Sequence, residues 1–599
     1  MDQYDVVVVG AGVSGLYAAW RLCVDTGSFP SSEMAIIEAS DRTGGRLRSW
    51  PLNRFDPSFP DDPTVRAELG GMRILNYNIY ACSLVGHLGL TLVPFPADVA
   101  VNWHYLRGDT IQGGNYPNQT IYQLAPSEVG WTPGEVVYNP LVVNSDIVPA
   151  DLFPTADGSV TQRQFVNSVM SDVTVEGVPP WKIGFWNAIL GSGAAGIPSP
   201  SDVSYQAYAY FVEAGAYDTV PANWNASVAF SNLLSDFSKQ PSYWAVTDGY
   251  EQITDALAAS LAGAGLVPTL NSPVTGLFYN ERQGVFLLRM ADGSEIIAGK
   301  VVLAMPPRAL ELIAANANVP ESMTGAPLAE LLPQIRQSAP IPLFKIFLVY
   351  DSDWWSPSLA ADWPAFTRMT TDMPMRQIYN FGQATDSFGK TYYLFQAVYC
   401  DSLKAGYWAG LMPQEGENEG EDLNTDIFSR IENLAGSTIE TGTLQFGTTD
   451  NLSNFPLFEA AHQQFSTMVG AVAEGQSLPP PSPLVPVAGA AMNWGTDPFG
   501  GGVNFWNVGV QLDDGQGGGG YWEMMNPAPN LYVVGEGYSL YQGWVEGALW
   551  SAEDMLERFF GLTSPGWLVT TPYSGPGEHV PVIAAGQGPA AVRALREQQ

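Results

Sequence analysis

The stretches that decide the fold are Asp5-Val-Val-Val-Val-Gly10-Ala-Gly12-Val-Ser-Gly15 and, further along, Ala35-Ile-Ile-Glu38. The β-branched run before Gly10 is uncharged, as expected for a strand buried on both faces. In the G-x-G-x-x-G spacing, Gly10 allows a tight turn, Gly12 lets backbone approach a diphosphate, and Gly15 lets the following helix pack on the strand. The helix N-terminus favours negative charge, and Glu38 is placed to accept ribose hydroxyls. The sequence therefore predicts a dinucleotide-binding βαβ unit.

The segment after Glu38 favours a flavin dinucleotide. It reads Asp41-Arg42-Thr43-Gly44-Gly45-Arg46, in which small residues allow close backbone approach and Arg46 can pair with a phosphate. The alternative is a solvated basic turn. A Rossmann strand, Glu38 and this R-x-G-G-R segment together resemble the FAD-binding opening of the flavin-containing amine oxidase family. The resemblance implies FAD as the cofactor.

Composition excludes several other classes of function. The chain carries 25 basic and 60 acidic residues, a net charge of −35, which opposes binding to nucleic acid or anionic membranes. Three separated cysteines and four scattered histidines form no disulfide or metal pattern. We see no signal peptide and no apolar run long enough to span a membrane. We therefore expect no metal and, by default, a cytoplasmic protein, with an exported mature form as the alternative.

At 599 residues the chain exceeds one hydrophobic core. The resemblance implies an α/β fold, with a Rossmann-type FAD-binding domain of the two-dinucleotide-binding-domain flavoprotein fold, a mixed-sheet substrate domain and a helical insertion. We assign residues 1–60, 241–335 and 520–565 to the FAD-binding domain, 61–125 and 336–519 to the substrate-binding domain, 126–240 to the helical domain and 566–599 to a C-terminal tail. The acidic tract 414–426 is expected to be a solvated loop, and the proline-rich stretch 478–483 a stiff linker.

The segment Glu68-Leu-Gly70-Gly71-Met72-Arg73 points to the substrate. In the wider family it faces the reactive side of the flavin, and an arginine at the last position resembles the L-amino acid oxidases. There it forms a bidentate pair with the substrate carboxylate, which suits the planar guanidinium. The alternative is an internal salt bridge to an acid such as Glu68.

A second segment agrees with this assignment. Asp372-Met-Pro-Met-Arg376-Gln-Ile-Tyr379 resembles the D-x-P-x-R-x-I-Y segment of the L-amino acid oxidases, in which the tyrosine hydroxyl also contacts the carboxylate. The resemblance therefore assigns Tyr379 as the second carboxylate ligand. By itself, a tyrosine in a strand is more often part of the core.

Lys345 interrupts an otherwise apolar predicted strand. A buried lysine must shift its pKa or find a partner, whereas a lysine that reaches the surface would be structural. In the family, a lysine on the corresponding strand holds a water near the flavin and assists the reaction with O2. We therefore assign Lys345, with Arg73 and Tyr379, as catalytic residues.

The C-terminal third carries further resemblances. Met492-Asn493-Trp494, followed by Asp497 and three glycines, is similar to the family segment K-W-x-x-D … G-G, but Asn493 replaces the basic residue. Gly535-Glu536 resembles the second FAD signature. The flavin-bonding cysteine of monoamine oxidases has no counterpart here, so FAD is expected to bind non-covalently. The resemblance assigns these substrate-binding residues: Arg73, Tyr379, Phe381, Trp494, Val503, Gly543 and Trp544. It assigns these cofactor-binding residues: Gly10, Gly12, Gly15, Glu38, Ala39, Arg46, Gly70, Gly71, Met72, Arg73, Val274, Trp494, Gly535, Glu536, Gly543, Trp544 and Val545.

The function implied by the resemblance is oxidative deamination of L-amino acids by an FAD-dependent L-amino acid oxidase. The products are an α-keto acid, ammonia and hydrogen peroxide. The expected partners are the amino acid, O2 and further copies of the chain, in a homodimer or a higher homo-oligomer. Apolar side chains at the matched pocket positions favour large apolar or aromatic substrates. An amino acid 2-monooxygenase, which releases an amide and carbon dioxide, and an amine oxidase remain enzymatic alternatives. A flavoprotein that only binds a partner is the non-enzymatic one.

Overall fold

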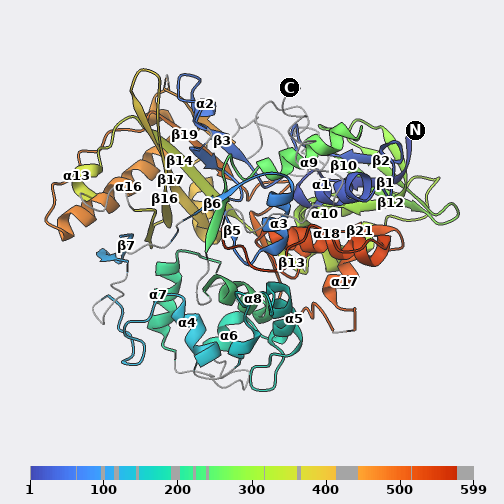
Figure 1. Ribbon diagram of the computed structural model, residues 1–599, viewed down its shortest axis with the longest axis horizontal. Coiled ribbons are helices and arrows are strands. Elements are labelled where there is room, and N and C mark those ends of the chain that lie inside the picture. Colours follow the sequence, from blue (N-terminus) through green and yellow to red (C-terminus); the bar gives the residue numbers. More distant parts are fainter. Residues whose placement is uncertain are drawn as a thin grey trace.

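The computed structural model describes residues 2–575 except 63, 96, 98–100, 114–120, 144–146, 191–202, 220–223, 238–241, 316–317, 360–365, 413–442, 449 and 515. The described chain forms three lobes: the N-terminal sheet with its helices, a second large sheet, and a cluster of helices below them (Figure 1). The predicted acidic tract 414–426 and the tail beyond residue 575 lie outside the described residues.

The first sheet contains the predicted βαβ unit. Its order is β10-β11-β12-β1-β2, with β21 also paired to β12. Strands β2, β1, β12 and β21 run parallel, while β10, β11 and β12 form an antiparallel meander. The bounds are β1 Asp2–Val9, β2 Met34–Ile37, β10 Val274–Asn280, β11 Val285–Met290, β12 Glu295–Leu303 and β21 Leu531–Val533. Val6 to Val9 are buried, as predicted for a central parallel strand.

Helices pack around this sheet. Helix α1 (Val13–Trp20) lies against α9 (Gln252–Gly263) and α18 (Val545–Phe560). The last of these begins immediately after Gly543-Trp544, where the sequence predicted a helix. The described part of the C-terminal tail packs on the same lobe, since the Trp567 ring lies edge-on to Tyr17 and tilted against Trp20.

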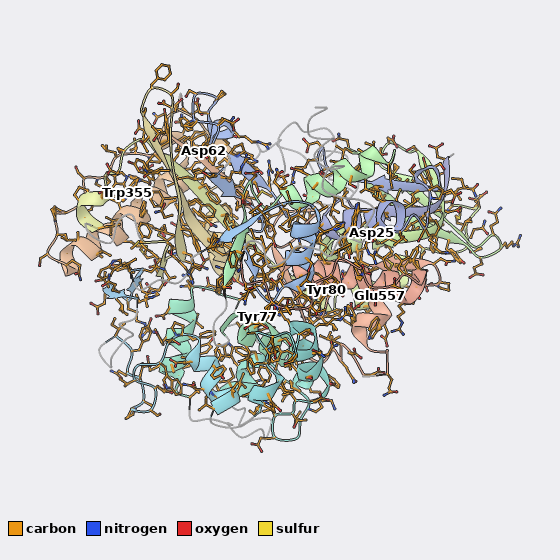
Figure 2. All side chains as sticks on the ribbon, viewed as in Figure 1. Asp25, Asp62, Tyr77, Tyr80, Trp355 and Glu557 are labelled. Atoms are coloured by element: carbon orange, nitrogen blue, oxygen red, sulfur yellow. The ribbon has the colours of Figure 1, made fainter. Side chains whose placement is uncertain are left out.

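The second sheet has the order β18-β19-β14-β17-β16-β15-β7-β8. It is antiparallel except between β15 and β7. Helix α16 (Pro456–Gly475) packs on one face together with Trp355, which Figure 2 places in this lobe. The bounds are β7 Trp103–Leu106, β8 Asp109–Gln112, β14 Leu343–Tyr350, β15 Arg368–Thr371, β16 Gln377–Thr385, β17 Thr391–Asp401, β18 Thr443–Phe446 and β19 Ala488–Asn493.

Strand β14 is buried along its whole length, but its two faces differ. Phe344, Ile346 and Leu348 join the core beneath α16. Leu343, Phe347 and Val349 join a separate core that contains Trp494. Because side chains alternate along a strand, Lys345 belongs to this second face.

The helical lobe is built around α8 (Ala226–Phe237), which contacts α4, α5 and α6. Arg163 of α5 pairs with Asp554 of α18 and donates to the Tyr80 hydroxyl at 3.2 Å. Figure 2 shows Tyr80 where the helical lobe meets the first lobe. The other bounds are α4 Glu135–Tyr138, α5 Gln162–Ser171, α6 Phe185–Leu190 and α7 Tyr205–Gly215.

The remaining strands and α-helices are short. The strands are β3 Ser49–Pro51, β4 Arg66–Glu68, β5 Ile74–Leu75, β6 Leu92–Pro94, β9 Tyr243–Val246, β13 Ser338–Ile341 and β20 Val503–Trp506. The helices are α2 Leu52–Phe55, α3 Ile79–His87, α10 Pro307–Ala314, α11 Pro327–Glu330, α12 Leu332–Ile335, α13 Ser356–Leu359, α14 Ser402–Ala409 and α17 Gly520–Met525. The domain boundaries given from the sequence stay a prediction.

Candidate active site

A cavity of about 440 Å³ lies where the three lobes meet. Its wall includes Gly12 before α1, Phe211 of the helical lobe, Lys345 of β14, Val503 of β20 and Trp544 before α18. Segments that are far apart in sequence therefore face one space.

The glycines of the first turn differ in the space around them. Gly10 has φ +104°, and a Cβ there would lie 2.4 Å from the Ala304 carbonyl oxygen. A Cβ on Gly15 would lie 2.0 Å from the Gly10 carbonyl oxygen, so Gly15 permits close helix–strand packing and does not line the cavity. Gly12 lies in the cavity wall, and only Gly45 would approach a Cβ there, at 3.9 Å. The open space beside Gly12 and the N-terminus of α1 suits a diphosphate.

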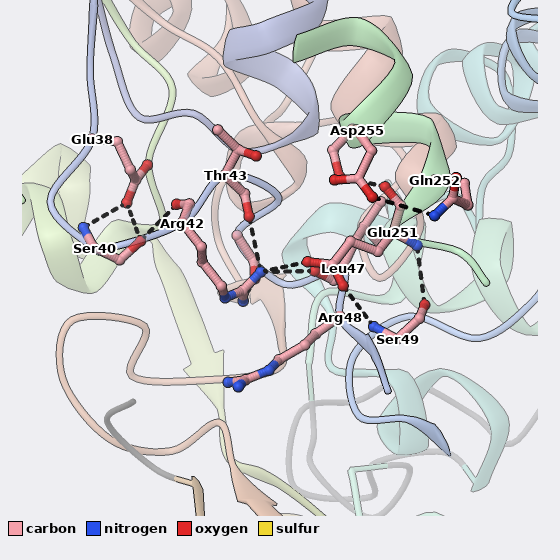
Figure 3. Close-up of polar contacts among 12 residues, drawn as sticks. Glu38, Ser40, Arg42, Thr43, Leu47, Arg48, Ser49, Glu251, Gln252 and Asp255 are labelled. Atoms are coloured by element: carbon pink, nitrogen blue, oxygen red, sulfur yellow. Dashed lines mark hydrogen bonds and ion pairs between the residues drawn. The ribbon is translucent and has the colours of Figure 1, made fainter. Parts of the chain in front are cut away.

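Glu38 and the loop after it are held by internal hydrogen bonds (Figure 3). The Glu38 carboxylate accepts from the Ala11 N–H at 2.6 Å and from the Ser40 N–H and Oγ at 2.9 and 2.8 Å. Arg42 donates to the carbonyls of Thr43 and Leu47 and pairs with Glu251 at 3.2 Å. Arg42 therefore shapes the loop, and both Arg42 and Glu38 line the cavity.

Arg46 and Glu536 form an ion pair in the cavity wall. Arg46 Nη1 lies 2.8 Å from Glu536 Oε2 and also donates to the Gly502 carbonyl at 3.0 Å. Glu536 also accepts from the N–H groups of Asn504 and Gly543, at 3.0 and 2.7 Å. This carboxylate thus joins two predicted segments, and the guanidinium beside it offers positive charge to a ligand anion.

Arg73 lies deep in the protein but faces the cavity. It donates to the hydroxyls of Tyr379 and Tyr217, at 3.2 and 3.1 Å, and its guanidinium lies 4.5 Å from the centre of the Tyr243 ring. It forms no ion pair with any carboxylate of the described residues. Glu68, the internal partner considered from the sequence, instead accepts from Ser49 Oγ and the Tyr250 N–H.

Lys345 is buried and lies in the cavity wall. Its Nζ donates to the carbonyls of Glu68 and Gly70 at 2.9 and 2.5 Å. Burial lowers the pKa of Lys345 to about 7 and raises the pKa of Glu68 to about 7. An ammonium has three donors, so one remains beyond the two carbonyls.

The remaining substrate positions separate into two groups. Trp494, Val503, Gly543 and Trp544 line the cavity, and Trp494 Nε1 donates to the Leu69 carbonyl at 2.7 Å. Tyr379 and Phe381 are not among the described residues of the cavity wall. Tyr379 touches the site through Arg73, while Phe381 packs against Phe95 and Phe347.

Comparison with known proteins identifies the family of this sequence. The model of the flavin-containing amine oxidoreductases matches residues 13–130 and 196–554. The chain belongs to this family. Among relatives of this flavin amine oxidoreductase, aplysianin-A of Aplysia kurodai is 24% identical over 93% of this chain and 90% of its own. Achacin of Lissachatina fulica is 24% identical, over 93% of each chain.

Other matches are shorter in sequence or concern the fold. The L-amino-acid oxidase of Gloydius halys is 31% identical over 134 residues, 22% of this chain and 24% of its own. A solved structure of a putrescine oxidase double mutant superposes with a TM-score of 0.56 at 16% identity, over 93% of this chain and all of the other. The two-domain FAD-binding fold predicted from the sequence is thereby confirmed.

The cofactor of this flavin amine oxidoreductase is FAD, and the cavity fits it. Glycine backbone, a helix N-terminus and a carboxylate surround one part, as a nucleotide and diphosphate require. Apart from Gly15, every residue that the sequence assigned to the cofactor lies in the cavity wall. The individual contacts stay a prediction, as does the non-covalent mode of binding.

The sequence did not single out four residues around Arg73 and Lys345. Tyr217 and Tyr243 contact Arg73. Tyr399 is the direct β17 neighbour of Lys345, whose Nζ lies 4.9 Å from its ring centre. Asp401, at the end of β17, is buried in the wall, and burial raises its pKa to about 6. Only the pairing of β14 with β17 could have pointed to Tyr399.

The described residues also bear on membrane insertion and metal binding. No described helix combines the length and apolarity needed to cross a bilayer. The described His, Cys, Asp and Glu residues do not gather in groups of three or more that could hold a metal ion.

Proposed function

We propose that this protein is an FAD-dependent L-amino acid oxidase, which converts an L-amino acid, O2 and water into an α-keto acid, ammonia and hydrogen peroxide. The observation that carries the proposal is the guanidinium of Arg73. It faces the cavity deep inside the protein and has no carboxylate partner among the described residues. Such a charge is costly to bury unless it is paired, and a substrate carboxylate would supply the missing partner.

The chain's own groups perform positioning and proton control. Arg73 and a tyrosine hydroxyl beside it hold the substrate carboxylate. This fixes the direction of the Cα–H bond. When bound, FAD supplies the two-electron acceptor that O2 regenerates with formation of hydrogen peroxide. The substrate amine must be neutral to lose this hydrogen. The resulting imino acid takes up water and releases ammonia.

Lys345 is proposed to assist the step that consumes O2. Its pKa near 7 allows the Nζ to hold or release a proton at neutral pH. Lys345→Met should therefore slow reoxidation by O2 at least tenfold, which rapid mixing with oxygenated buffer measures. The amino acid should still reduce the flavin of the Lys345→Met variant in the absence of O2.

The helical lobe supports a preference for large apolar or aromatic side chains. Phe211, Trp224 and Leu233 of this lobe line the cavity together with Phe505 of β20, and apolar walls favour apolar substrates. The carboxylate of Asp401 is already hydrogen-bonded within the protein, because it accepts from the Asp218 and Thr219 N–H groups.

The decisive experiment is anaerobic bleaching of the purified yellow protein by a panel of L-amino acids, D-amino acids and amines. Bleaching by L-amino acids, with peroxide and ammonia formed in equal amounts in air, supports the proposal. Carbon dioxide release would instead favour an amino acid 2-monooxygenase, and bleaching by amines alone would favour an amine oxidase. A protein that stays yellow with every compound would contradict all three.

A further inference from the structure

Two tyrosine hydroxyls accept hydrogen bonds from Arg73, but they differ in whether their own proton is donated to another group of the protein. The Tyr379 hydroxyl donates to Gln377 Oε1 at 2.9 Å. The Tyr217 hydroxyl accepts from Arg73 Nη2 at 3.1 Å, and its proton has no acceptor among the described residues. A hydroxyl has one proton to donate, so Tyr379 has already committed its proton to the protein.

The two side chains also differ in their access to the cavity. Tyr379 is 1% exposed and is not among the described wall residues. Tyr217 is half-buried and lies in the wall, with its ring edge-on to Tyr399 at 5.9 Å between centres. A ligand in the cavity therefore meets Tyr217 and Arg73 together.

We propose that Tyr217, from the helical lobe, is the hydroxyl donor to the substrate carboxylate, and that Tyr379 orients Arg73. The inference rests on the proposed function, since it needs a carboxylate on Arg73. It moves the second carboxylate contact from Tyr379 of the second sheet to Tyr217, which follows α7. The helical lobe thereby completes the site that the two sheets form.

Asp401 holds the segment that carries Tyr217. Its carboxylate accepts from the Asp218 N–H at 2.6 Å, from the Thr219 N–H at 3.2 Å and from the Thr219 hydroxyl. On the other side of Tyr217, Gln377 Nε2 donates to the Ala216 carbonyl at 3.1 Å. Side chains of the second sheet thus form hydrogen bonds to the backbone before and after Tyr217, and Asp401 acts as a positioning residue.

The test measures calorimetric binding of benzoate, a simple carboxylate probe, to the FAD-loaded protein and its variants. Tyr217→Phe should weaken binding roughly 10- to 100-fold, the size expected for one hydrogen bond to a charged group. Tyr379→Phe should weaken it less. Tyr205→Phe, an exposed position at the start of α7, the helix that ends two residues before Tyr217, should bind like the wild type. Equal FAD content and thermal midpoints confirm that the variants fold.

The outcomes separate this inference from the proposed function. Wild-type bleaching by L-amino acids, with loss of benzoate binding in Arg73→Met but none in Tyr217→Phe, would overturn the role of Tyr217 alone. A larger loss in Tyr379→Phe than in Tyr217→Phe would do the same. A wild type that binds no benzoate and is bleached by no amino acid would overturn both.

The positioning role of Asp401 has its own readout. Asp401→Asn should weaken benzoate binding and raise KM for the amino acid, with a smaller change in kcat. In a Tyr217→Phe background it should add nothing, because its effect passes through Tyr217. An undiminished effect in that background would overturn the positioning role.

Discussion

At the scale of single residues, the site depends on two cations placed where cations are costly. Arg73 faces the cavity without a described carboxylate partner, and Lys345 is buried in a strand whose other residues are apolar. Lys345 stands out in the sequence because a lysine is seldom buried without a reason, whereas Arg73 stands out through the resemblance of its segment to the L-amino acid oxidases. Their surroundings determine how each would act.

Replacing Arg73 by lysine tests the need for a planar, two-pronged donor. Arg73→Lys keeps the charge but loses the bidentate geometry, so we expect kcat/KM for L-amino acids to fall roughly 100-fold, mainly through KM. Steady-state peroxide assays measure this. An unchanged kcat/KM would contradict carboxylate recognition at this position, and Arg282→Lys on an exposed turn is the control.

The depressed pKa of Lys345 predicts a pH dependence of stability. Burial lowers this pKa from 10.5 to about 7, so between these values the unfolded chain binds more protons than the native one. The unfolding free energy therefore gains a contribution that increases as pH rises from 7 towards 10.5. In Lys345→Met this gain, on the order of 3 kcal/mol, should be absent.

Denaturant unfolding of wild type and Lys345→Met between pH 7 and 10 measures the difference. Lys390→Met, at an exposed lysine paired with Asp351, is the matched control. Parallel pH profiles for wild type and Lys345→Met would show that Lys345 keeps its proton in the folded protein.

At the scale of elements, the junction of β1 and α1 depends on the absence of side chains. A Cβ on Gly15 would overlap the Gly10 carbonyl oxygen at 2.0 Å, and Gly10 is held against β2 by the hydrogen bond from its N–H to the Ile37 carbonyl at 2.7 Å. Moving α1 away from β1 would disrupt its packing, because α1 is buried between α9 and α18.

Gly15→Ala is therefore expected to destabilise the protein by roughly 3 kcal/mol and to lower its FAD content. Thermal unfolding and the ratio of flavin to protein absorbance measure both effects. Gly263→Ala, in α9 with no atom within 4 Å of the added Cβ, should be neutral or stabilising by up to about 1 kcal/mol. A stable Gly15→Ala variant with full FAD content would contradict the close-packing argument.

At the scale of the whole molecule, three lobes meet around the cavity while the chain carries a net charge of −35. Self-repulsion of this size opposes a compact state and is screened by salt. We expect the thermal midpoint to rise by a few degrees between about 10 and 150 mM NaCl. A fall would mean that attractive ion pairs such as Arg308–Asp497 outweigh the repulsion.

The βαβ unit, the family and many residues of the cavity wall could be predicted from the sequence alone, because they belong to local patterns. A β-branched run, three glycines at fixed spacing and an acid after the second strand specify backbone geometry within about forty residues. The burial of Lys345 likewise followed from the apolar residues on both sides of it.

The packing of the chain was needed to show that Tyr217 contacts Arg73 and that Asp401 holds the segment of Tyr217, whereas the resemblance had already placed Tyr379 beside Arg73. Tyr217 and Asp401 come from the helical lobe and from a strand of the second sheet, and no local pattern relates their positions. A tyrosine in sequence carries no record of where its hydroxyl proton goes. That depends on which acceptor the packed chain brings within 3 Å, here Gln377 for Tyr379, because hydrogen bonds are short and directional.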